Sequence, residues 1–280
     1  MHRSNLLALG AIVLWASLAM LGVRLAHLPP LWLTGVALLI GSVMALPLSR
    51  LDFAQWRLPL RTLVLGVYGL FGFHFLLFMA LRHAPPVQAN LVNYLWPLGM
   101  VVLAPLLLPG QRLTLRHTVA ACVGFAGAAL AIMGGRSFEG GLAWGYALAL
   151  ASAFVWASYS LLTQRVPPFT TSAIGLFALV SGLLSLACHV WLEPPAQVRA
   201  EDWPLLILMG LGPLGAAFYL WDAALKRGDP QQIGLLSFLT PLLSTLLLLW
   251  DRGQAISASV AGAAVLIVGA AWLGRSKPQR

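Results

Sequence analysis

Residues 90–97 read Asn-Leu-Val-Asn-Tyr-Leu-Trp-Pro, and residues 98–109 continue as an almost purely apolar run. The two together are long enough to cross a bilayer, so amides, aromatic rings and a proline lie inside a membrane-spanning segment. Polar groups are tolerated at that depth only where they face protein or a water-filled cavity. Pro97 also cannot donate to the carbonyl of Asn93, four residues earlier, and should therefore kink the helix. This stretch predicts one wall of a substrate site within a membrane protein.

The composition places the whole chain in the membrane. Of the 280 residues, 60% are hydrophobic and only 9% are charged, whereas soluble domains carry about 25% charged residues. Apolar segments of about twenty residues, the length that spans the hydrocarbon layer, can be placed ten times. We therefore expect an all-α polytopic membrane protein with ten transmembrane helices. Their expected centres are Leu14, Leu39, Leu70, Trp96, Gly124, Ala153, Val180, Gly215, Thr240 and Val265.

The second half of the chain repeats landmarks of the first at a nearly constant spacing. Trp15 returns as Trp156, Leu81 as Leu225, and Pro97 as Pro241. Each half then holds five spans. Because five is odd, the second copy must enter the membrane upside down, as in many secondary transporters. We expect two inverted five-helix repeats, residues 1–137 and residues 138–280.

The loop charges predict the orientation of the chain. Twelve Lys and Arg residues fall on the side of the N-terminus and five on the other side, which favours both termini in the cytoplasm by the positive-inside rule. The net charge of +9 does not indicate nucleic acid, because the basic residues form no contiguous face. We expect a multi-pass monomer of the cell (inner) membrane, with the lipid bilayer and a small-molecule substrate as partners.

The fourth predicted span carries most of the candidate substrate-binding residues. Asn90, Asn93, Tyr94 and Pro97 follow the i, i+3, i+4, i+7 spacing of one helix face. Trp96 points away from Tyr94 in an ideal helix, so both rings can line one cavity only if the proline distorts the turn.

The second half supplies matching candidates. Trp156 and Tyr159 form an aromatic cluster in the sixth span, and Ser237 stands four residues before Pro241, as Asn93 does before Pro97. Aromatic residues also form belts at membrane interfaces. These rings lie near the middle of their spans, which favours a cavity lining.

Two titratable residues are embedded in predicted spans. Asp222 is a candidate for binding substrate or a proton, but Lys226 follows one helical turn later, and a structural ion pair is an equal alternative. His74 stands among phenylalanines and is either hydrogen-bonded filler or part of the site. No Lys or Arg falls near the middle of a span, which disfavours phosphate-rich substrates. No P-loop, catalytic triad or Cys/His cluster is present, so we expect no enzymatic activity, no cofactor and no metal.

Ten spans in two repeats, the run Leu225-Lys226-Arg227 leading into Asp229-Pro230, and the prolines at 97 and 241 make the chain similar to the drug/metabolite transporter superfamily of the EamA type. The resemblance implies export of aromatic and other neutral amino acids from the cytoplasm through a central cavity between the third, fourth, sixth, eighth and ninth helices. It also implies that Tyr94, Trp96 and Trp156 line the substrate site. In one departure, the acidic residue of the family's Gly-Glu-x-Leu pattern is Gln111 or Gln254 here.

We therefore expect an exporter of small, mostly neutral solutes, namely amino acids, that works by alternating access. Export of neutral or cationic drugs or metabolites is the nearest alternative. A membrane-embedded enzyme is an alternative from another class.

Overall fold

The computed structural model describes residues 3–134 and 143–274, and all regular structure in them is helical. Nine helical stretches in this part of the chain are long and apolar enough to cross a membrane, and α16 (Ala258–Leu273) is a shorter tenth. The predicted ten-span, all-α architecture is confirmed. The predicted boundary between the halves, at residues 137 and 138, lies outside the described residues. In chain order the nine stretches are Arg3–Arg24, Pro30–Leu48, Leu60–His83, Pro86–Leu107, Leu115–Met133, Trp144–Leu162, Thr171–Leu192, Ala200–Leu225 and Pro230–Asp251.

Most of the spans are interrupted, and the helices on the two sides of a break have separate labels. The first half contains α1 (Arg3–Ala16), α2 (Leu18–Arg24), α3 (Pro30–Ser42), α4 (Ala45–Leu48), α5 (Leu60–Val67), α6 (Phe73–His83), α7 (Pro86–Asn93), α8 (Trp96–Leu107) and α9 (Leu115–Met133). The second contains α10 (Trp144–Leu162), α11 (Ile174–Leu192), α12 (Trp203–Leu211), α13 (Ala217–Leu225), α14 (Pro230–Leu236), α15 (Leu239–Asp251) and α16.

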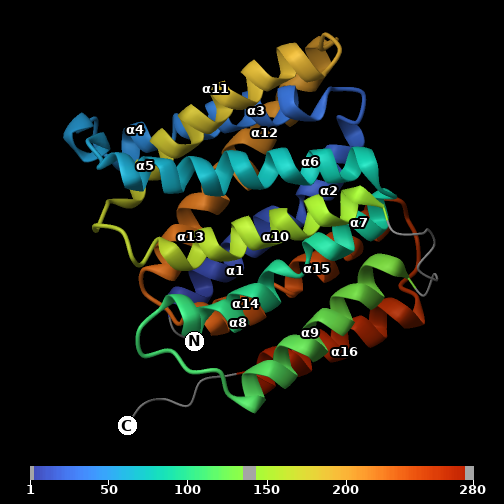
Figure 1. Cartoon of the computed structure of the whole chain (residues 1–280). Coiled ribbons are helices and arrows are strands. Elements are labelled where there is room, and N and C mark those ends of the chain that lie inside the picture. Colours follow the sequence, from blue (N-terminus) through green and yellow to red (C-terminus); the bar gives the residue numbers. More distant parts are fainter. Residues whose placement is uncertain (1–2, 135–142, 275–280) are drawn as a thin grey trace.

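The two halves pack against each other through corresponding helices. The fifth and tenth spans pair as α9 and α16, and the second and seventh pair as α3 and α11 (Figure 1). The third span packs on the sixth through α6 and α10, and the eighth packs on the first through α13 and α1. If the first half is exchanged for the second, the fifth–tenth and second–seventh contacts map onto themselves. The contact of the third span with the sixth maps onto that of the eighth with the first. Since each half has five spans, this is the packing of an inverted repeat.

Small residues allow the closest of these contacts. A Cβ atom on Gly35 would lie 3.0 Å from the carbonyl O of Gly182, and one on Gly182 would lie 2.9 Å from the carbonyl O of Gly35. In the third span, Cβ atoms on Gly66 and Gly69 would lie 2.2 Å from the rings of Phe177 and Tyr159, respectively. These glycines make room for neighbouring helices and their rings.

The two prolines that correspond in the repeat, Pro97 and Pro241, stand in the first turn of a new helix. α7 ends at Asn93 and α8 begins at Trp96, so Pro97 is the second residue of α8, and Pro241 is the third residue of α15. A missing N–H carries no penalty there, because the first-turn N–H groups have no partner within the helix. The third and eighth spans also widen into π-helical turns at corresponding places, Tyr68–Gly72 and Gly212–Ala216.

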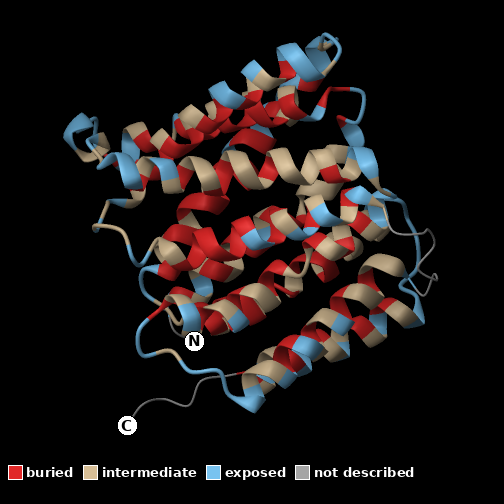
Figure 2. Ribbon diagram, viewed as in Figure 1, coloured by how far each residue is buried: buried red, intermediate tan, exposed pale blue. Residues whose placement is uncertain are grey.

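Burial follows the pattern of a membrane protein. Buried residues run through the middle of the bundle, and exposed ones lie on its periphery and at its ends (Figure 2). Large apolar side chains cover the periphery; Leu106 is 76% exposed and Val265 is 73% exposed. A contiguous exposed apolar surface of this kind suits contact with lipid.

Candidate functional site

A cavity of about 800 Å³ lies between the two halves. The first, second, third, fourth, sixth, eighth and ninth spans supply its walls, with one residue from the fifth. The lining reaches Ala26 just after α2, Leu81 in the last turn of α6 and Val87 at the start of α7. Val23 and Val87 in this rim are exposed. The cavity therefore opens at this end of the bundle, which we call the open end; we call the opposite end the closed end.

Aromatic rings form the floor of the cavity toward the closed end. Trp156 is the hub: its ring centroid lies 5.6 Å from that of Trp15, 6.4 Å from Trp96 and 5.7 Å from Phe218. The Trp15 and Trp96 rings meet Trp156 edge to face, the favoured arrangement of aromatic quadrupoles. Trp221 lies beneath them, 1% exposed, and its Nε1 donates to Ser160 Oγ at 3.1 Å. The floor is thus a packed aromatic layer that blocks passage to the closed end.

His74 stands in the cavity wall with one ring nitrogen fixed. Its Nδ1 lies 2.6 Å from the carbonyl O of Leu70, which belongs to the π-helical turn of the third span. Because a carbonyl only accepts, Nδ1 carries the hydrogen, and Nε2 of the neutral ring is an acceptor. In its neutral form His74 therefore offers a hydrogen-bond acceptor, and in its protonated form a donor, in an otherwise largely apolar wall.

The amides of the fourth span also lie in the wall. Ser152 Oγ connects Asn93 to the third span, at 3.1 Å from Asn93 Oδ1 and 3.0 Å from the carbonyl O of Phe73. The two oxygens share the single hydrogen of this hydroxyl, which holds the Asn93 side chain beside the third span. Asn90 and Tyr94 line the same wall, as does Trp96. The helix is interrupted at residues 94 and 95, and this turn lets the Tyr94 and Trp96 rings face one cavity. A distortion of this kind near Pro97 was expected from the sequence.

Seven of the residues singled out from the sequence line the cavity, namely His74, Asn90, Asn93, Tyr94, Trp96, Trp156 and Pro241. Pro97 is buried in the first turn of α8 and does not line it. Tyr159 lies behind Trp156, with ring centroids 5.3 Å apart, and is 3% exposed. Ser237 is fully buried, and its Oγ donates to the carbonyl O of Ile233 at 2.9 Å. The break before Pro241 turns that hydroxyl back onto its own helix.

Asp222 also lies outside the cavity. Its Oδ2 accepts from Lys226 Nζ at 2.6 Å and from Thr171 Oγ1 at 2.7 Å, toward the closed end and beyond the aromatic floor. In this conformation the carboxylate is part of a structural ion pair, the alternative that the spacing to Lys226 left open.

Several lining residues were not singled out from the sequence. Trp15 and Phe218 contribute rings to the floor, and Thr34, Thr240, Ser244 and Thr245 contribute hydroxyl-bearing side chains. The repeat carried a signal for two of them, because Trp15 corresponds to Trp156, and Phe218 stands 144 residues after His74. The lining contains no Asp, Glu, Lys or Arg among the described residues.

Two inverted halves around a central cavity that opens at one end of the bundle define a membrane transporter and not an enzyme. The chain belongs to the EamA-like transporter family, whose model matches residues 2–133 and again residues 143–275, once in each half.

Two relatives named as exporters align with this chain over almost its full length. The chain is 39% identical to a protein of Ancylobacter novellus named aromatic amino acid exporter YddG, over 97% of each chain. It is 26% identical to the protein of the same name from Escherichia coli, over 97% of this chain and 96% of that one. A solved crystal structure superposes on this chain with a TM-score of 0.89 at 36% identity, covering 98% of this chain and 97% of the other.

Proposed function

We propose that this transporter exports amino acids, aromatic and other neutral ones, from the cytoplasm by alternating access through the central cavity. The observation that carries the proposal is the uncharged cavity with an aromatic floor. A volume of about 800 Å³ lies within the range of small-molecule sites, about 300–1,000 Å³. The names of the two exporter relatives support the same substrate class.

A zwitterion can be bound in this cavity without a buried counter-charge. The ammonium group can lie over the indole faces of Trp96 or Trp156, where the attraction is about 0.5–2 kcal/mol, and can donate to His74 Nε2. The carboxylate can accept from the amide groups of Asn90 or Asn93. Dispersed contacts of this size give weak binding and broad selectivity, which allows the protein to release its cargo.

The loop charges and the position of the open end together suggest which side of the membrane the cavity faces. The positive-inside rule puts the start of α1 in the cytoplasm. The open end, where α2 ends and α3 begins, is then the outer face of the membrane, and the cavity is outward-open. Both termini would be cytoplasmic. One chain encloses the whole cavity, so a monomer suffices for transport.

Counterflow in liposomes tests the proposal. Purified protein is reconstituted into vesicles loaded with unlabelled phenylalanine, and uptake of labelled phenylalanine, tryptophan and serine is measured. We expect uptake of all three above empty vesicles, with the aromatic substrates favoured. No uptake of any amino acid by folded protein would refute the substrate class.

Export of cationic drugs or metabolites is the second candidate, and the three indoles in the cavity wall favour it, because aromatic cages bind quaternary ammonium groups. Competition separates the two. If a quaternary ammonium compound inhibits phenylalanine counterflow and is itself taken up, the range extends to cations. If it does neither, the cavity requires the carboxylate of an amino acid.

A further inference from the structure

At the closed end, Thr171 joins the seventh span to an ion pair of the eighth, Asp222 and Lys226; we call these three residues the inner latch. Lys226 Nζ lies 2.6 Å from Asp222 Oδ2 and 3.9 Å from the centre of the Phe169 ring, and Thr171 donates to the same carboxylate oxygen. The Asp222 side chain is only 2% exposed. Since Lys226 ends the eighth span and Thr171 begins the seventh, the inner latch ties these two spans together.

The repeat assigns a counterpart to each member of the inner latch at the open end. The spacing of 144 residues that relates Pro97 to Pro241 relates Arg82 to Lys226 and Phe78 to Asp222. The first half thus keeps the cation at the end of its third span but has an apolar ring in place of the carboxylate.

The packing of α3 on α11 supplies the third counterpart. A Cβ atom on Gly35 would approach Gly182, and one on Gly175 would approach the carbonyl O of Ser42 at 2.9 Å. Gly35 and Gly175, and likewise Ser42 and Gly182, are 140 residues apart, so the two contacts are equivalent in the repeat. The same spacing relates Leu31 to Thr171. Since Arg82 corresponds to Lys226 and Leu31 to Thr171, an equivalent contact at the open end would place Arg82 next to the start of α3.

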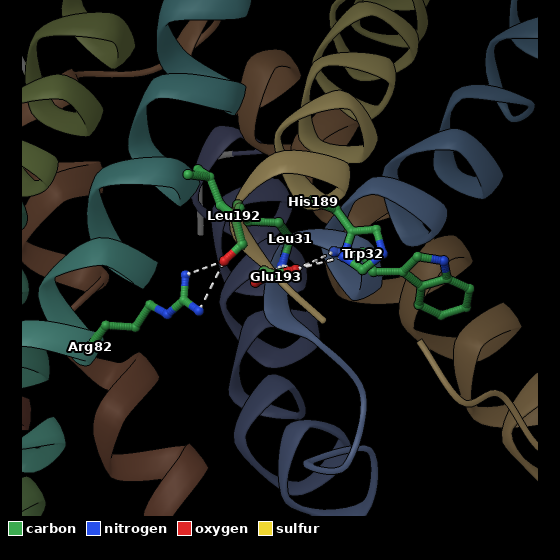
Figure 3. Close-up of polar contacts among 6 residues, drawn as sticks. All are labelled: Leu31, Trp32, Arg82, His189, Leu192 and Glu193. Carbon is green, nitrogen blue, oxygen red and sulfur yellow. Dashed lines mark hydrogen bonds and ion pairs between the residues drawn. The ribbon is translucent and has the colours of Figure 1, made fainter. Parts of the chain in front are cut away.

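A carboxylate from another element stands at that place (Figure 3). Glu193, directly after α11, accepts from the backbone N–H of Leu31 at 3.0 Å and of Trp32 at 3.2 Å, and from His189 Nδ1 at 3.0 Å. Its side chain is 1% exposed. These donors hold Glu193 on the first turn of α3, where helix N–H groups stabilise an anion.

Arg82 reaches toward this carboxylate from the third span. Its two terminal nitrogens donate to the carbonyl O of Leu192, each at 3.2 Å, so that the guanidinium stops one residue before Glu193 (Figure 3). Arg82 is otherwise exposed at the rim of the cavity, one residue after the lining residue Leu81.

We propose that Arg82 and Glu193 form the outer latch of the transporter. When the open end closes, Arg82 leaves the Leu192 carbonyl and pairs with the Glu193 carboxylate, while Thr171 separates from Asp222 at the other end. Gaining a polar contact between spans at one end while losing one at the other keeps the outward-open and inward-open states close in free energy, as alternating access requires. This inference rests on the alternating access proposed above.

Thiol labelling tests the outer latch. Cys122 and Cys188 are replaced by Ala, and Ser244→Cys places a reporter of the same size in the cavity wall. Labelling by a bulky maleimide is measured on detergent-solubilised protein, where its rate follows the fraction of molecules with an open cavity at this end. Arg82→Gln should label about threefold to fivefold faster, the effect of losing one partly exposed ion pair. Arg82→Lys should label like the parent, because a lysine serves in the inner latch.

The matched control is Arg199→Gln, another arginine at the open end, which forms an ion pair with the exposed Glu201. It should leave the rate unchanged. Glu193→Gln should match Arg82→Gln, and the double variant should be no faster than either single one, since both changes remove one interaction.

An unchanged rate in Arg82→Gln, an equal increase in Arg199→Gln, or effects that multiply in the double variant would overturn the outer latch. Added phenylalanine separates this failure from that of the proposed function. If phenylalanine changes the labelling rate while Arg82→Gln does not, the protein alternates without this latch. If neither has an effect, alternation is itself refuted.

Discussion

Replacing Trp96 by alanine should lower transport of aromatic amino acids more than transport of small neutral ones. The ring is 5% exposed and lies with its centroid 6.5 Å from Trp15, 6.4 Å from Trp156 and 5.7 Å from Trp221. Its removal costs about 3–5 kcal/mol of stability, a loss shared by all substrates. An aromatic cargo additionally loses one ring pair, about 0.5–1.5 kcal/mol. The ratio of phenylalanine to serine transport should therefore fall about 2- to 13-fold.

The assay measures both substrates in the same vesicles, so that differences in folding and reconstitution cancel in the ratio. Trp156→Ala should lower the ratio similarly. Trp221→Ala is the matched control, because Trp221 belongs to the same aromatic cluster but does not line the cavity. It should reduce total transport and leave the ratio unchanged. Equal losses for all substrates in Trp96→Ala, or an equal change of ratio in Trp221→Ala, would mean that these rings hold the fold and do not select the cargo.

Three further expectations concern the rest of the molecule. Reporter fusions after Gly110 should report the cytoplasm and fusions after His83 the outside; a swap of the two would invert the proposed orientation. Asp222→Asn should lower the yield of folded protein without abolishing any dependence on a pH gradient, because the carboxylate is engaged in the inner latch; a stimulation by a proton gradient that is present in the parent and lost in the variant would contradict this. Gly69→Val should lower the melting temperature in detergent, because a Cβ atom there would lie 2.2 Å from the Tyr159 ring, whereas an unchanged melting temperature would show that the helices can move apart.

The number of spans and the repeat could be predicted from the sequence because both rest on local patterns. Apolar runs of the right length and the recurrence of Pro97 as Pro241 fix the architecture without any knowledge of packing. The positions of the helix breaks were harder to predict from the sequence. The sequence suggested helices kinked at the prolines, whereas each proline stands in the first turn of a new helix, so the break falls several residues earlier.

The cavity lining could be predicted only in part, since position in a span does not say which way a side chain points. Trp96 and Tyr94 face one cavity only because residues 94 and 95 form a turn. Ser237 corresponds to Asn93 yet bonds to its own helix, and Tyr159 is hidden behind Trp156. Trp15 was missed although it stands at the expected centre of the first span and corresponds to Trp156 in the repeat. These distinctions come from packing between helices far apart in the chain.

The described cavity lining contains no Asp, Glu, Lys or Arg, and this bears on how transport responds to the membrane potential. A wall that holds no fixed charge moves none across the bilayer when the protein changes state, and a zwitterion adds no net charge. Export of phenylalanine would then be electroneutral, and its direction would depend only on the concentrations on the two sides. A cation would instead be held back by an interior-negative potential, by about 2.3 kcal/mol per 100 mV. If the proposed function holds, amino acid export would therefore continue unopposed by a high membrane potential.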